Sequence, residues 1–345
     1  MKLGIIGCGR VSMHYSELKN QGKLDFIEFV SCYDSNSKKA YELSENLGCK
    51  VYEEEEDFLS QQDLDFVLVL TPSGNHFNTA SKLLRNGMSV IIEKPMTLIP
   101  KELKVLENIA HLNRTSIYGI LQNRFNPAVV ELENMIRTNQ IGRLLVGGLR
   151  LRWGRTEEYY SDGWHGTWLM DGGVISQQGV HHIFALDQLF GPIIEVAAIS
   201  SNRRFNIKAE DSLVGYARTF DGALFTLELT TSSYQGDYQA EISCLTEKGL
   251  FELGGISLNT LKFRNNGTKE EKILAHEEVL NGYGYGHVQE LMRIKADLEK
   301  NKLPIIDINN SRRALMLIHS IYSSIENGGK PVKVIESNVS KRLGV

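Results

Sequence analysis

Short apolar runs alternate with amphipathic stretches up to residue 120. The apolar runs are rich in β-branched residues and contain no charge, and they lie at 3–6, 29–33, 66–70, 89–92 and 116–120. Between them, helical periodicity appears at 11–21, 37–47, 75–86 and 101–112. Strands that are apolar throughout and alternate with helices are typical of a parallel sheet covered on both faces. The acidic run at 53–57 falls between two elements and is expected as a solvated loop or a helix start.

The pattern changes after residue 123. A helical stretch at 127–138 leads into a strand at 144–153, and a glycine-rich segment follows at 163–182. Further strand-like runs then occur at 194–200, 212–220, 223–232, 239–245, 249–253 and 260–264, before helical patterns at 286–300 and 309–326. Turn pairs such as Asp221-Gly222 and Lys248-Gly249 separate some of these runs and favour antiparallel pairing. The sequence therefore predicts an α/β protein with two closely associated domains, 1–122 and 123–345.

Composition and charge narrow the class of protein. Of the 345 residues, 42% are hydrophobic and 23% charged, as in ordinary soluble globular proteins. Lys and Arg number 38 against 42 Asp and Glu, a formal net charge of −4, so no basic field favours nucleic acid. No apolar run approaches the ~20 residues that a membrane span needs. The scattered cysteines, without CxxC spacing, and a start too short and glycine-rich for a signal peptide indicate a cytoplasmic protein.

A glycine loop follows the first predicted strand. Gly7, Gly9 and Ser12 occupy the positions of G-x-G-x-x-G, with serine replacing the last glycine. Such a loop lets the backbone approach a pyrophosphate at the N-terminus of the next helix. Its position between a strand and a helix, at the start of the chain, favours a dinucleotide site.

Asp34 ends the second predicted strand. An acidic side chain at this place can accept hydrogen bonds from the adenosine ribose and would repel a 2′-phosphate, which favours NAD over NADP. Lys38 and Lys39 follow closely and could still accommodate a phosphate, so NADP stays as the less favoured cofactor. The alternative interpretation is an exposed aspartate that caps the next helix.

Several segments together resemble one family, the Gfo/Idh/MocA oxidoreductases. The matching pieces are GIIGCGRVS, TPSGNHFNTA at 71–80, EKPM at 93–96, QNRFNP at 122–127 and GGVISQQGVHHI at 172–183. The resemblance implies a Rossmann dinucleotide-binding domain, followed by an α/β domain with a large, mostly antiparallel open sheet. It also implies a homo-oligomer, a dimer or a tetramer.

The resemblance assigns catalytic roles to Lys94 and His181. In the family, the lysine of EKP enters the active site beside the nicotinamide and the reacting substrate carbon, and Pro95 restricts its backbone. The His181 imidazole is the expected base, and the Lys94 ammonium would stabilise the developing alkoxide. Which of the two finally holds the proton stays open. An isolated EKP would instead indicate only a strand end that reaches water.

The resemblance also places further loop and strand-end residues at the cofactor. These are Gly7, Gly9, Arg10, Val11, Asp34, Thr71, Pro72, His76, Glu93, Lys94 and Gln122. Cys8 is expected as a small residue within the glycine loop. No metal is expected, because the histidine pair at 181–182 has no carboxylate or thiolate at ligand spacing.

Gln177 is the clearest departure from the family pattern. Many members carry aspartate four residues before the histidine, one helical turn away, and an amide cannot raise the basicity of an imidazole as a carboxylate would. Gln177 is therefore expected to bind substrate or orient the ring of His181, against the alternative of a helix-surface glutamine. His182, at the adjacent helical position, is expected to be a packing neighbour.

The segment WGRTEEYYSDGWHGTWLMDGG resembles a stretch of the family's UDP-sugar 3-dehydrogenases, with His165 at the place of an expected arginine. Arg155, Tyr159 and Tyr160 are candidate diphosphate or uracil contacts, against the alternative of a surface loop. The resemblance places Arg124 beside cofactor and substrate. The segment GYGYGH at 282–287 could close over a sugar or simply cap the next helix.

The sequence thus predicts NAD-dependent oxidation of a secondary alcohol, at C3 of a UDP-linked N-acetylated amino sugar. A dehydrogenase of free cyclitols or hexoses and a 3-keto-sugar reductase are alternatives. A dinucleotide-binding regulatory protein is a further alternative, although such relatives tend to lose the lysine or the histidine, and this chain has both.

Overall fold

The computed structural model describes residues 1–234, 236–265, 271–279, 281–300 and 305–345. These residues form two compact units, each with its own sheet. The first unit consists of Met1–Leu121 and Val288–Arg312, and the second of Gln122–His287 and Arg313–Val345.

The first unit contains a seven-stranded parallel sheet in the order β15-β6-β5-β4-β1-β2-β3. Its strands are β1 (Lys2–Ile6), β2 (Glu28–Tyr33), β3 (Lys50–Val51), β4 (Phe66–Val69), β5 (Val90–Ile92), β6 (Ile117–Gly119) and β15 (Ile306–Asp307). The strand order reverses next to β1, as in dinucleotide-binding sheets, where ligands bind beyond the carboxyl ends of the strands.

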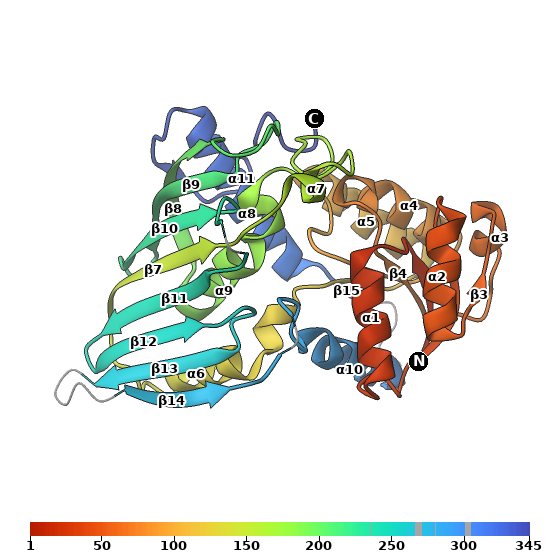
Figure 1. Ribbon diagram of the computed structural model, residues 1–345, viewed down its shortest axis with the longest axis horizontal. Helices are drawn as coiled ribbons and strands as arrows, with labels where there is room; N and C mark the ends of the chain where they lie inside the picture. The colour runs from red at the N-terminus through yellow and green to blue at the C-terminus, as the bar shows by residue number, and fades with distance from the viewer. Residues whose placement is uncertain (235, 266–270, 280, 301–304) are drawn as a thin grey trace. The chain divides into compact units, whose positions relative to one another are not determined.

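Helices connect these strands (Figure 1). They are α1 (Arg10–Asn20), α2 (Ser37–Leu47), α3 (Glu55–Leu59), η1 (Ser73–Asn75), α4 (His76–Arg85), α5 (Pro100–Asn113) and α10 (Gly286–Glu299). Helix α1 packs on α2, and α4 packs on α5. The acidic run at 53–57 is thus a helix start, because α3 begins within it.

The late segment Val288–Arg312 belongs to the first unit, whereas the sequence placed it in the second domain. β15 pairs in parallel with β6, with Ile306 opposite Ile117. The buried carboxylate of Glu290 accepts the backbone N–H of Leu121 at 3.1 Å. The pairing of β15 with β6 adds an edge strand to the sheet.

The second unit contains a nine-stranded, mostly antiparallel sheet in the order β14-β13-β12-β11-β7-β10-β9-β8-β16, in which β7 and β10 run parallel. Its strands are β7 (Leu144–Arg152), β8 (Ile193–Ser201), β9 (Ser212–Thr219), β10 (Leu224–Thr230), β11 (Gln239–Thr246), β12 (Gly249–Gly254), β13 (Thr260–Asn265), β14 (Glu271–His276) and β16 (Val332–Lys333). The hairpins β9–β10 and β11–β12 turn at the two predicted glycine pairs.

Helices α6 (Pro127–Arg137), α8 (Val174–Gln177) and α9 (Val180–Phe190) pack on one face of this sheet (Figure 1). The unit also contains η2 (Gln122–Phe125), which packs on α6 and α9, together with α7 (Glu157–Tyr160) and α11 (Asn309–Glu326). Alternate residues of β10 and β11 point into this core, and the residues between them are half-buried or exposed. These strands therefore alternate between the buried core and the opposite face of the sheet, which is called the open face below.

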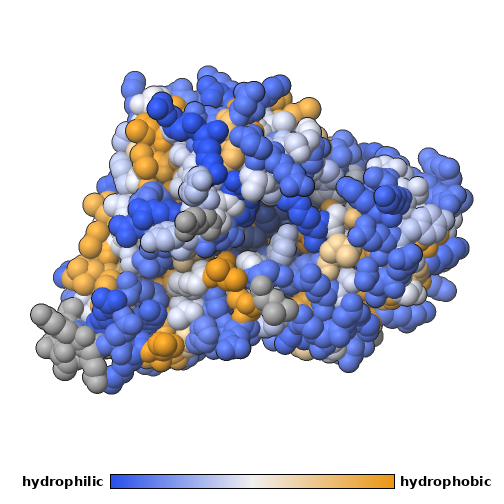
Figure 2. Space-filling model, viewed as in Figure 1, coloured by the Kyte–Doolittle hydropathy of each residue, from blue (hydrophilic) through white to orange (hydrophobic). Residues whose placement is uncertain are grey.

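The open face carries both ion pairs and apolar side chains. Arg152 Nε lies 2.6 Å from Glu228 Oε1, across β7 and β10. At the other end of the same strands, Leu224, Val146 and Leu245 stand opposite one another and are 48%, 44% and 38% exposed. Figure 2 shows apolar surface gathered over this end of the sheet.

The helices and the cysteines of the described residues bear on the environment of the chain. None of the helices formed by these residues is long and apolar enough to cross a membrane. All four cysteines are buried free thiols, as expected from their spacing.

Candidate active site

The glycine loop has the geometry that a bound diphosphate requires. Gly7 has φ +97°, and a Cβ there would lie 2.6 Å from the backbone of Leu70 and Thr71, so no other residue fits. Gly9 caps α1, and a Cβ on it would meet no atom of the described chain within 4 Å, which leaves open space at the helix N-terminus. Ser12 is buried and donates to the carbonyl of Gly9 at 2.7 Å, which explains why a small residue suffices there.

Asp34 lies directly against this loop. Its Oδ2 accepts the backbone N–H of Cys8 at 2.7 Å, and its Oδ1 accepts that of Asn36 at 2.8 Å. The side chain of Asn36, not that of Asp34, caps α2 by accepting the N–H of Lys38. The Asp34 carboxylate therefore lies beside the glycine loop, at the position where an acidic residue of such folds binds the ribose hydroxyls.

His76 ties two loops at the carboxyl end of the sheet together. It is buried, with Nδ1 2.7 Å from the carbonyl oxygen of Pro95 and Nε2 2.7 Å from that of Thr71. Burial lowers the pKa of His76, although both carbonyl contacts act in the opposite direction. Since its two ring nitrogens contact backbone carbonyls, His76 fixes the segments 71–72 and 93–95 relative to each other.

Lys94 lies two residues after the end of β5, at the carboxyl end of the sheet. Its side chain is half-buried, and its backbone N–H donates to Oε2 of the buried Glu93 at 3.0 Å. The peptide bond to Pro95 is cis. The negative charge of Glu93, after burial itself, raises the pKa of the nearby Tyr15 well above its usual range.

The residues of this unit fit a dinucleotide on two observations. Gly9 leaves open space at the start of α1, and the buried Oγ1 of Thr71 has no hydrogen-bond partner among the described residues. Arg10 and Val11 form the first turn of α1, next to the glycine loop. Pro72 directly follows Thr71 on the segment that precedes η1.

In the second unit, Gln177 ends α8 and His181 lies in the first turn of α9. Gln177 is half-buried and His181 is 9% exposed. His182 is fully buried and packs edge-on against Trp153, with ring centroids 5.5 Å apart, as a packing neighbour should. Burial lowers the pKa of His182 to about 4, so this imidazole is neutral at working pH.

Gln122 and Arg124 lie in η2, at the start of the second unit. The side chain of Gln122 is buried, and its Oε1 has no hydrogen-bond partner among the described residues. The guanidinium of Arg124 lies over the ring of Phe125. Gly286, in the GYGYGH segment, packs so closely on Gln122 that a Cβ would lie 2.1 Å from its carbonyl oxygen. This segment is thus packed against η2.

The two other predicted substrate residues make firm contacts within their own unit. Arg155 lies 2.8 Å from Asp237 and over the ring of Trp153. The hydroxyl of Tyr160 is 2.9 Å from Oγ1 of Thr231, and burial raises its pKa to about 12. Both side chains are held in place by the protein.

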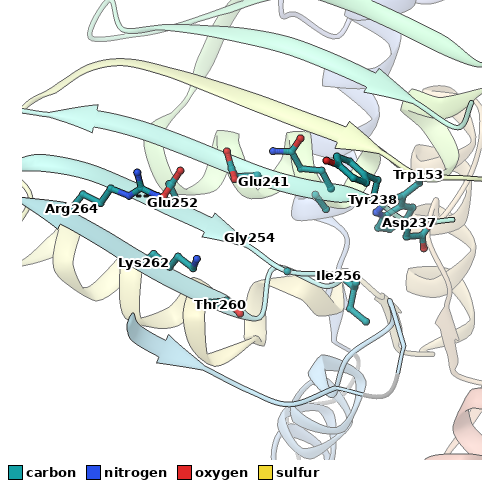
Figure 3. Close-up of a pocket in the computed structure, with 13 residues that line it drawn as sticks. Trp153, Asp237, Tyr238, Glu241, Glu252, Gly254, Ile256, Thr260, Lys262 and Arg264 are labelled. Carbon is teal, nitrogen blue, oxygen red and sulfur yellow. Dashed lines mark ion pairs between the residues drawn. The ribbon is translucent and has the colours of Figure 1, made fainter. Parts of the chain in front are cut away.

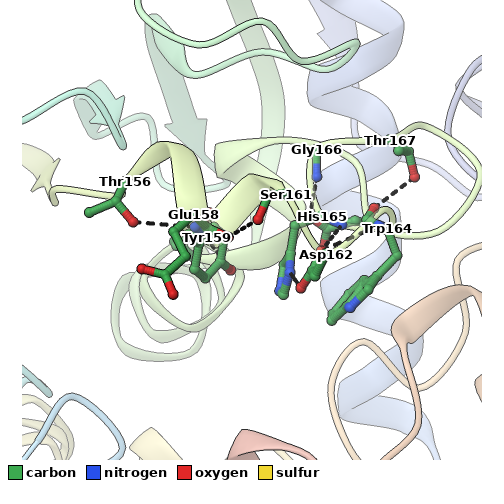
Figure 4. Close-up of polar contacts among 11 residues, drawn as sticks. Thr156, Glu158, Tyr159, Ser161, Asp162, Trp164, His165, Gly166 and Thr167 are labelled. Carbon is green, nitrogen blue, oxygen red and sulfur yellow. Dashed lines mark hydrogen bonds and ion pairs between the residues drawn. The ribbon is translucent and has the colours of Figure 1, made fainter.

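An imidazole and a carboxylate meet in the loop after α7 (Figure 4). Nδ1 of His165 lies 2.5 Å from Oδ2 of Asp162, whose Oδ1 also accepts the backbone N–H groups of Trp164 and His165. Burial alone would raise the pKa of Asp162, but these hydrogen bonds and the imidazole hold it below its usual range. The His165 ring also stacks on Trp164 and Tyr159, at centroid distances of 3.6 and 4.1 Å. Asp162 was not predicted from the sequence, although the pair Asp162-Gly163 is a turn signal.

A hollow of about 480 Å³ lies on the open face of the sheet (Figure 3). Its lining includes Glu241 and Glu252 on β11 and β12, and Lys262 and Arg264 on β13. It contains none of the predicted site residues, and Arg264 is paired with Glu252 at 3.6 Å. We therefore do not assign the active site to this hollow. Within the described residues, no group of three or more potential metal ligands occurs.

Comparison with known proteins identifies the two domains. Residues 1–117 match the model of the oxidoreductase family with an NAD-binding Rossmann fold, and residues 129–252 match the GFO/IDH/MocA C-terminal domain. The chain belongs to the Gfo/Idh/MocA oxidoreductase family. Its first unit is accordingly an NAD-binding Rossmann domain, and its second is the family's C-terminal domain, which confirms the predicted fold and cofactor.

The relatives of this chain differ in the ligands and activities that their names give. The WlbA dehydrogenase of Bordetella pertussis, solved with NADH and UDP-GlcNAcA, is 26% identical with a TM-score of 0.83, over 96% of this chain and 97% of that one. Inositol 2-dehydrogenase 2 of Saccharopolyspora erythraea is 25% identical over 75% of this chain and 73% of that enzyme. UDP-N-acetylglucosamine 3-dehydrogenase of Acidithiobacillus ferrooxidans is 28% identical over 32% of this chain and 33% of that enzyme. The chain spans less than half the length of several curated relatives that it matches.

Proposed function

We propose that this family member oxidises a sugar secondary alcohol with NAD, and that the alcohol is at C3 of a UDP-linked N-acetylated amino sugar. The observation that carries the proposal is the likeness to the WlbA dehydrogenases, which covers 96% of the chain and involves proteins solved with NADH and UDP-GlcNAcA. The partial match to a UDP-N-acetylglucosamine 3-dehydrogenase supports the same substrate class.

The first unit would hold the cofactor, which when bound accepts a hydride from the substrate carbon. The backbone of Gly7 and Gly9 and the start of α1, at Arg10 and Val11, would bind the diphosphate. Asp34 would accept the ribose hydroxyls. Further contacts are proposed for segments at the ends of the strands, at Thr71, Pro72, His76 and Glu93, and for Gln122.

Lys94 and His181 would act on the substrate hydroxyl. The His181 imidazole would take the proton as general base, and the Lys94 ammonium would donate a hydrogen bond to the alkoxide that develops. Glu93 supports this role, because its carboxylate accepts the backbone N–H of Lys94 and so holds the segment that carries the lysine. The remaining proposed substrate contacts are Gln177, Arg124, Arg155 and Tyr160.

A cyclitol dehydrogenase is the second candidate. The longer alignment to an inositol 2-dehydrogenase, over 75% of this chain, favours it. The same residues would also reduce a 3-keto sugar, because the chemistry is reversible. A regulatory dinucleotide-binding protein is the non-enzymatic alternative, and the presence of both Lys94 and His181 argues against it.

Thermal unfolding with ligand panels tests the substrate class. A ligand that binds only the native state raises its stability, by about 2.7 kcal/mol at a hundredfold excess over Kd. With NAD present, UDP-GlcNAcA should raise Tm while inositol should not. The reverse result would favour the cyclitol dehydrogenase.

We further propose a cytoplasmic homo-oligomer, dimer or tetramer, in which a second copy covers the open face. The apolar row Leu224, Val146 and Leu245 supports this, because exposed apolar side chains side by side favour association. Light scattering should give a multiple of the 38.8 kDa chain mass for the wild type. Val146→Glu should lower that mass, and an unchanged mass would remove this row from the interface.

A further inference from the structure

Two buried residues, Glu210 and Tyr322, bind three consecutive backbone N–H groups at the start of α8, two through their side chains and one through a backbone carbonyl. Oε1 of Glu210 accepts the N–H of Ile175 at 3.2 Å, and the Glu210 carbonyl accepts that of Val174 at 3.1 Å. The Tyr322 hydroxyl accepts the N–H of Gly173 at 2.9 Å and donates to Oε1 of Glu210 at 3.0 Å. The first N–H groups of a helix have no partner within the helix. This pair, Glu210 and Tyr322, is called the α8 anchor below.

The α8 anchor is connected to Gln177 and His181 through the backbone. The N–H of Gln177 donates to the carbonyl of Gly173 at 3.1 Å, and that of Gly179 donates to the carbonyl of Val174 at 2.7 Å. Helix α9, which carries His181 in its first turn, begins at the next residue. Any shift of the first turn of α8 therefore moves Gln177 and the start of α9.

The carboxyl of Glu210 has one bound and one unbound oxygen. The side chain is buried, and Oε2 has no hydrogen-bond partner among the described residues. A Cβ on Gly173 would lie 2.2 Å from this oxygen, so the space beside it is closed. Burial raises the pKa of Glu210 to about 7, despite the hydrogen bonds that it accepts.

Three titratable groups lie on the segments around this carboxyl. Tyr322 approaches from α11 and binds Oε1. Asp211, at the next position along the chain, raises the pKa of Glu210 further by its charge. Asp171, on the loop before α8, is bound through its backbone carbonyl to Ser176, and its Oδ2 accepts the N–H of Gly166. None of these three groups is a cation, and the Glu210 carboxylate is held by its hydrogen bonds to Ile175 and Tyr322.

We propose that the α8 anchor is a positioning element for catalysis: its carboxylate form holds α8 so that Gln177 and His181 meet the substrate. Charge-assisted hydrogen bonds are about twice as strong as neutral ones, so protonation of Glu210 loosens the start of α8. The proposal rests on the proposed function, because it takes His181 as the base. It adds a device that links activity to the ionisation of a residue outside the substrate-contacting set.

The Glu210→Gln variant tests the proposal, since an amide has the shape of the carboxylic acid and does not ionise. With NAD and UDP-GlcNAcA, kcat/KM of the variant should be about tenfold below wild type near pH 8 and should converge with it near pH 5.5. The KM for NAD should not change. Tyr322→Phe removes the hydroxyl that links Gly173 to Glu210 and should lower kcat/KM at both pH values.

Asp187→Asn is the matched control. Asp187 is also buried in the second unit, but it is paired with Arg313 at 2.6 Å. The activity of the Asp187→Asn variant, relative to wild type, should therefore be the same at both pH values. A ratio of E210Q to wild type that does not depend on pH would overturn the proposal, because a merely structural role gives that result.

Amide hydrogen exchange separates this proposal from the proposed function. At pH 8, the segment 173–183 should exchange about tenfold faster in E210Q than in wild type, with no substrate present. Absence of wild-type turnover on any UDP-sugar would refute the proposed substrate class, while the exchange experiment would still decide the anchor. Equal exchange in the two proteins would overturn the anchor whatever the substrate.

Discussion

Glu210 should make the second unit less stable as the pH rises through 7. Its pKa is raised by burial from 4.5 to about 7 in the folded protein, and the unfolded chain has the ordinary value. The folded state therefore binds this proton more tightly, so the stability that it contributes is fully present below pH 4.5 and is lost as the pH passes 7. At 1.36 kcal/mol per pKa unit, the difference between 4.5 and about 7 corresponds to about 3 kcal/mol of unfolding free energy.

The Glu210→Gln variant isolates this effect, because glutamine does not titrate. Relative to wild type, its free energy of unfolding should rise by about 2 kcal/mol between pH 5.5 and pH 8, which is the part of the shift that falls in that window. The variant is thus expected to be more stable and less active at pH 8, as when a buried charge serves function rather than stability.

Tryptophan fluorescence in urea can measure this change in the unit that contains Glu210. All three tryptophans, Trp153, Trp164 and Trp168, lie in the second unit. Asp187→Asn is again the control, since it removes a carboxylate paired with Arg313 and should destabilise at both pH values. If the difference between E210Q and wild type were equal at pH 5.5 and pH 8, the burial argument for Glu210 would be wrong.

Three further predictions concern other residues. Gly9→Ala should keep wild-type stability but lose NAD affinity in calorimetry, whereas Gly7→Ala should also destabilise, because only its Cβ would meet the backbone; equal stability losses would contradict this assignment. Asp34→Ala should narrow the preference for NAD over NADP in dehydrogenase assays, and an unchanged preference would remove Asp34 from the ribose site. In wild type, His182 should lower the free energy of unfolding as the pH falls from 6.5 to 4, because its folded pKa is lowered to about 4. His182→Phe should not show this fall. Urea unfolding of both proteins across that range checks this, and parallel pH curves would refute it.

The long elements of this fold could be predicted because their patterns are local. Most strands and helices with several apolar positions were placed within a few residues of their observed bounds, for example α2 at Ser37–Leu47 and α11 at Asn309–Glu326, but the strand β14 and the bounds of α9 were not predicted. The two-residue strands β3, β15 and β16 were missed, since two residues have no periodicity. The return of Val288–Arg312 to the first unit was missed as well, because it depends on pairing between β15 and β6.

In the candidate site too, residues in local motifs could be predicted, and residues that only the fold brings together could not. Motif residues such as Gly7 and Asp34 were found because their spacing alone predicts a loop beside a strand end. The α8 anchor was missed, because Glu210 and Tyr322 are 112 positions apart and only the folded chain brings them together. The capping role of Asn36 and the partnership of Asp162 with His165 were also missed, although both follow from turn signals within a few residues.

Formation of NADH from NAD and UDP-GlcNAcA tests the central claim most directly. Wild-type protein should reduce NAD in the presence of this sugar nucleotide, and Lys94→Met should lose about a thousandfold or more in kcat while it keeps its affinity for NAD. Turnover by the Lys94→Met variant at the wild-type rate, or reduction of NAD with inositol and not with the sugar nucleotide, would contradict the account.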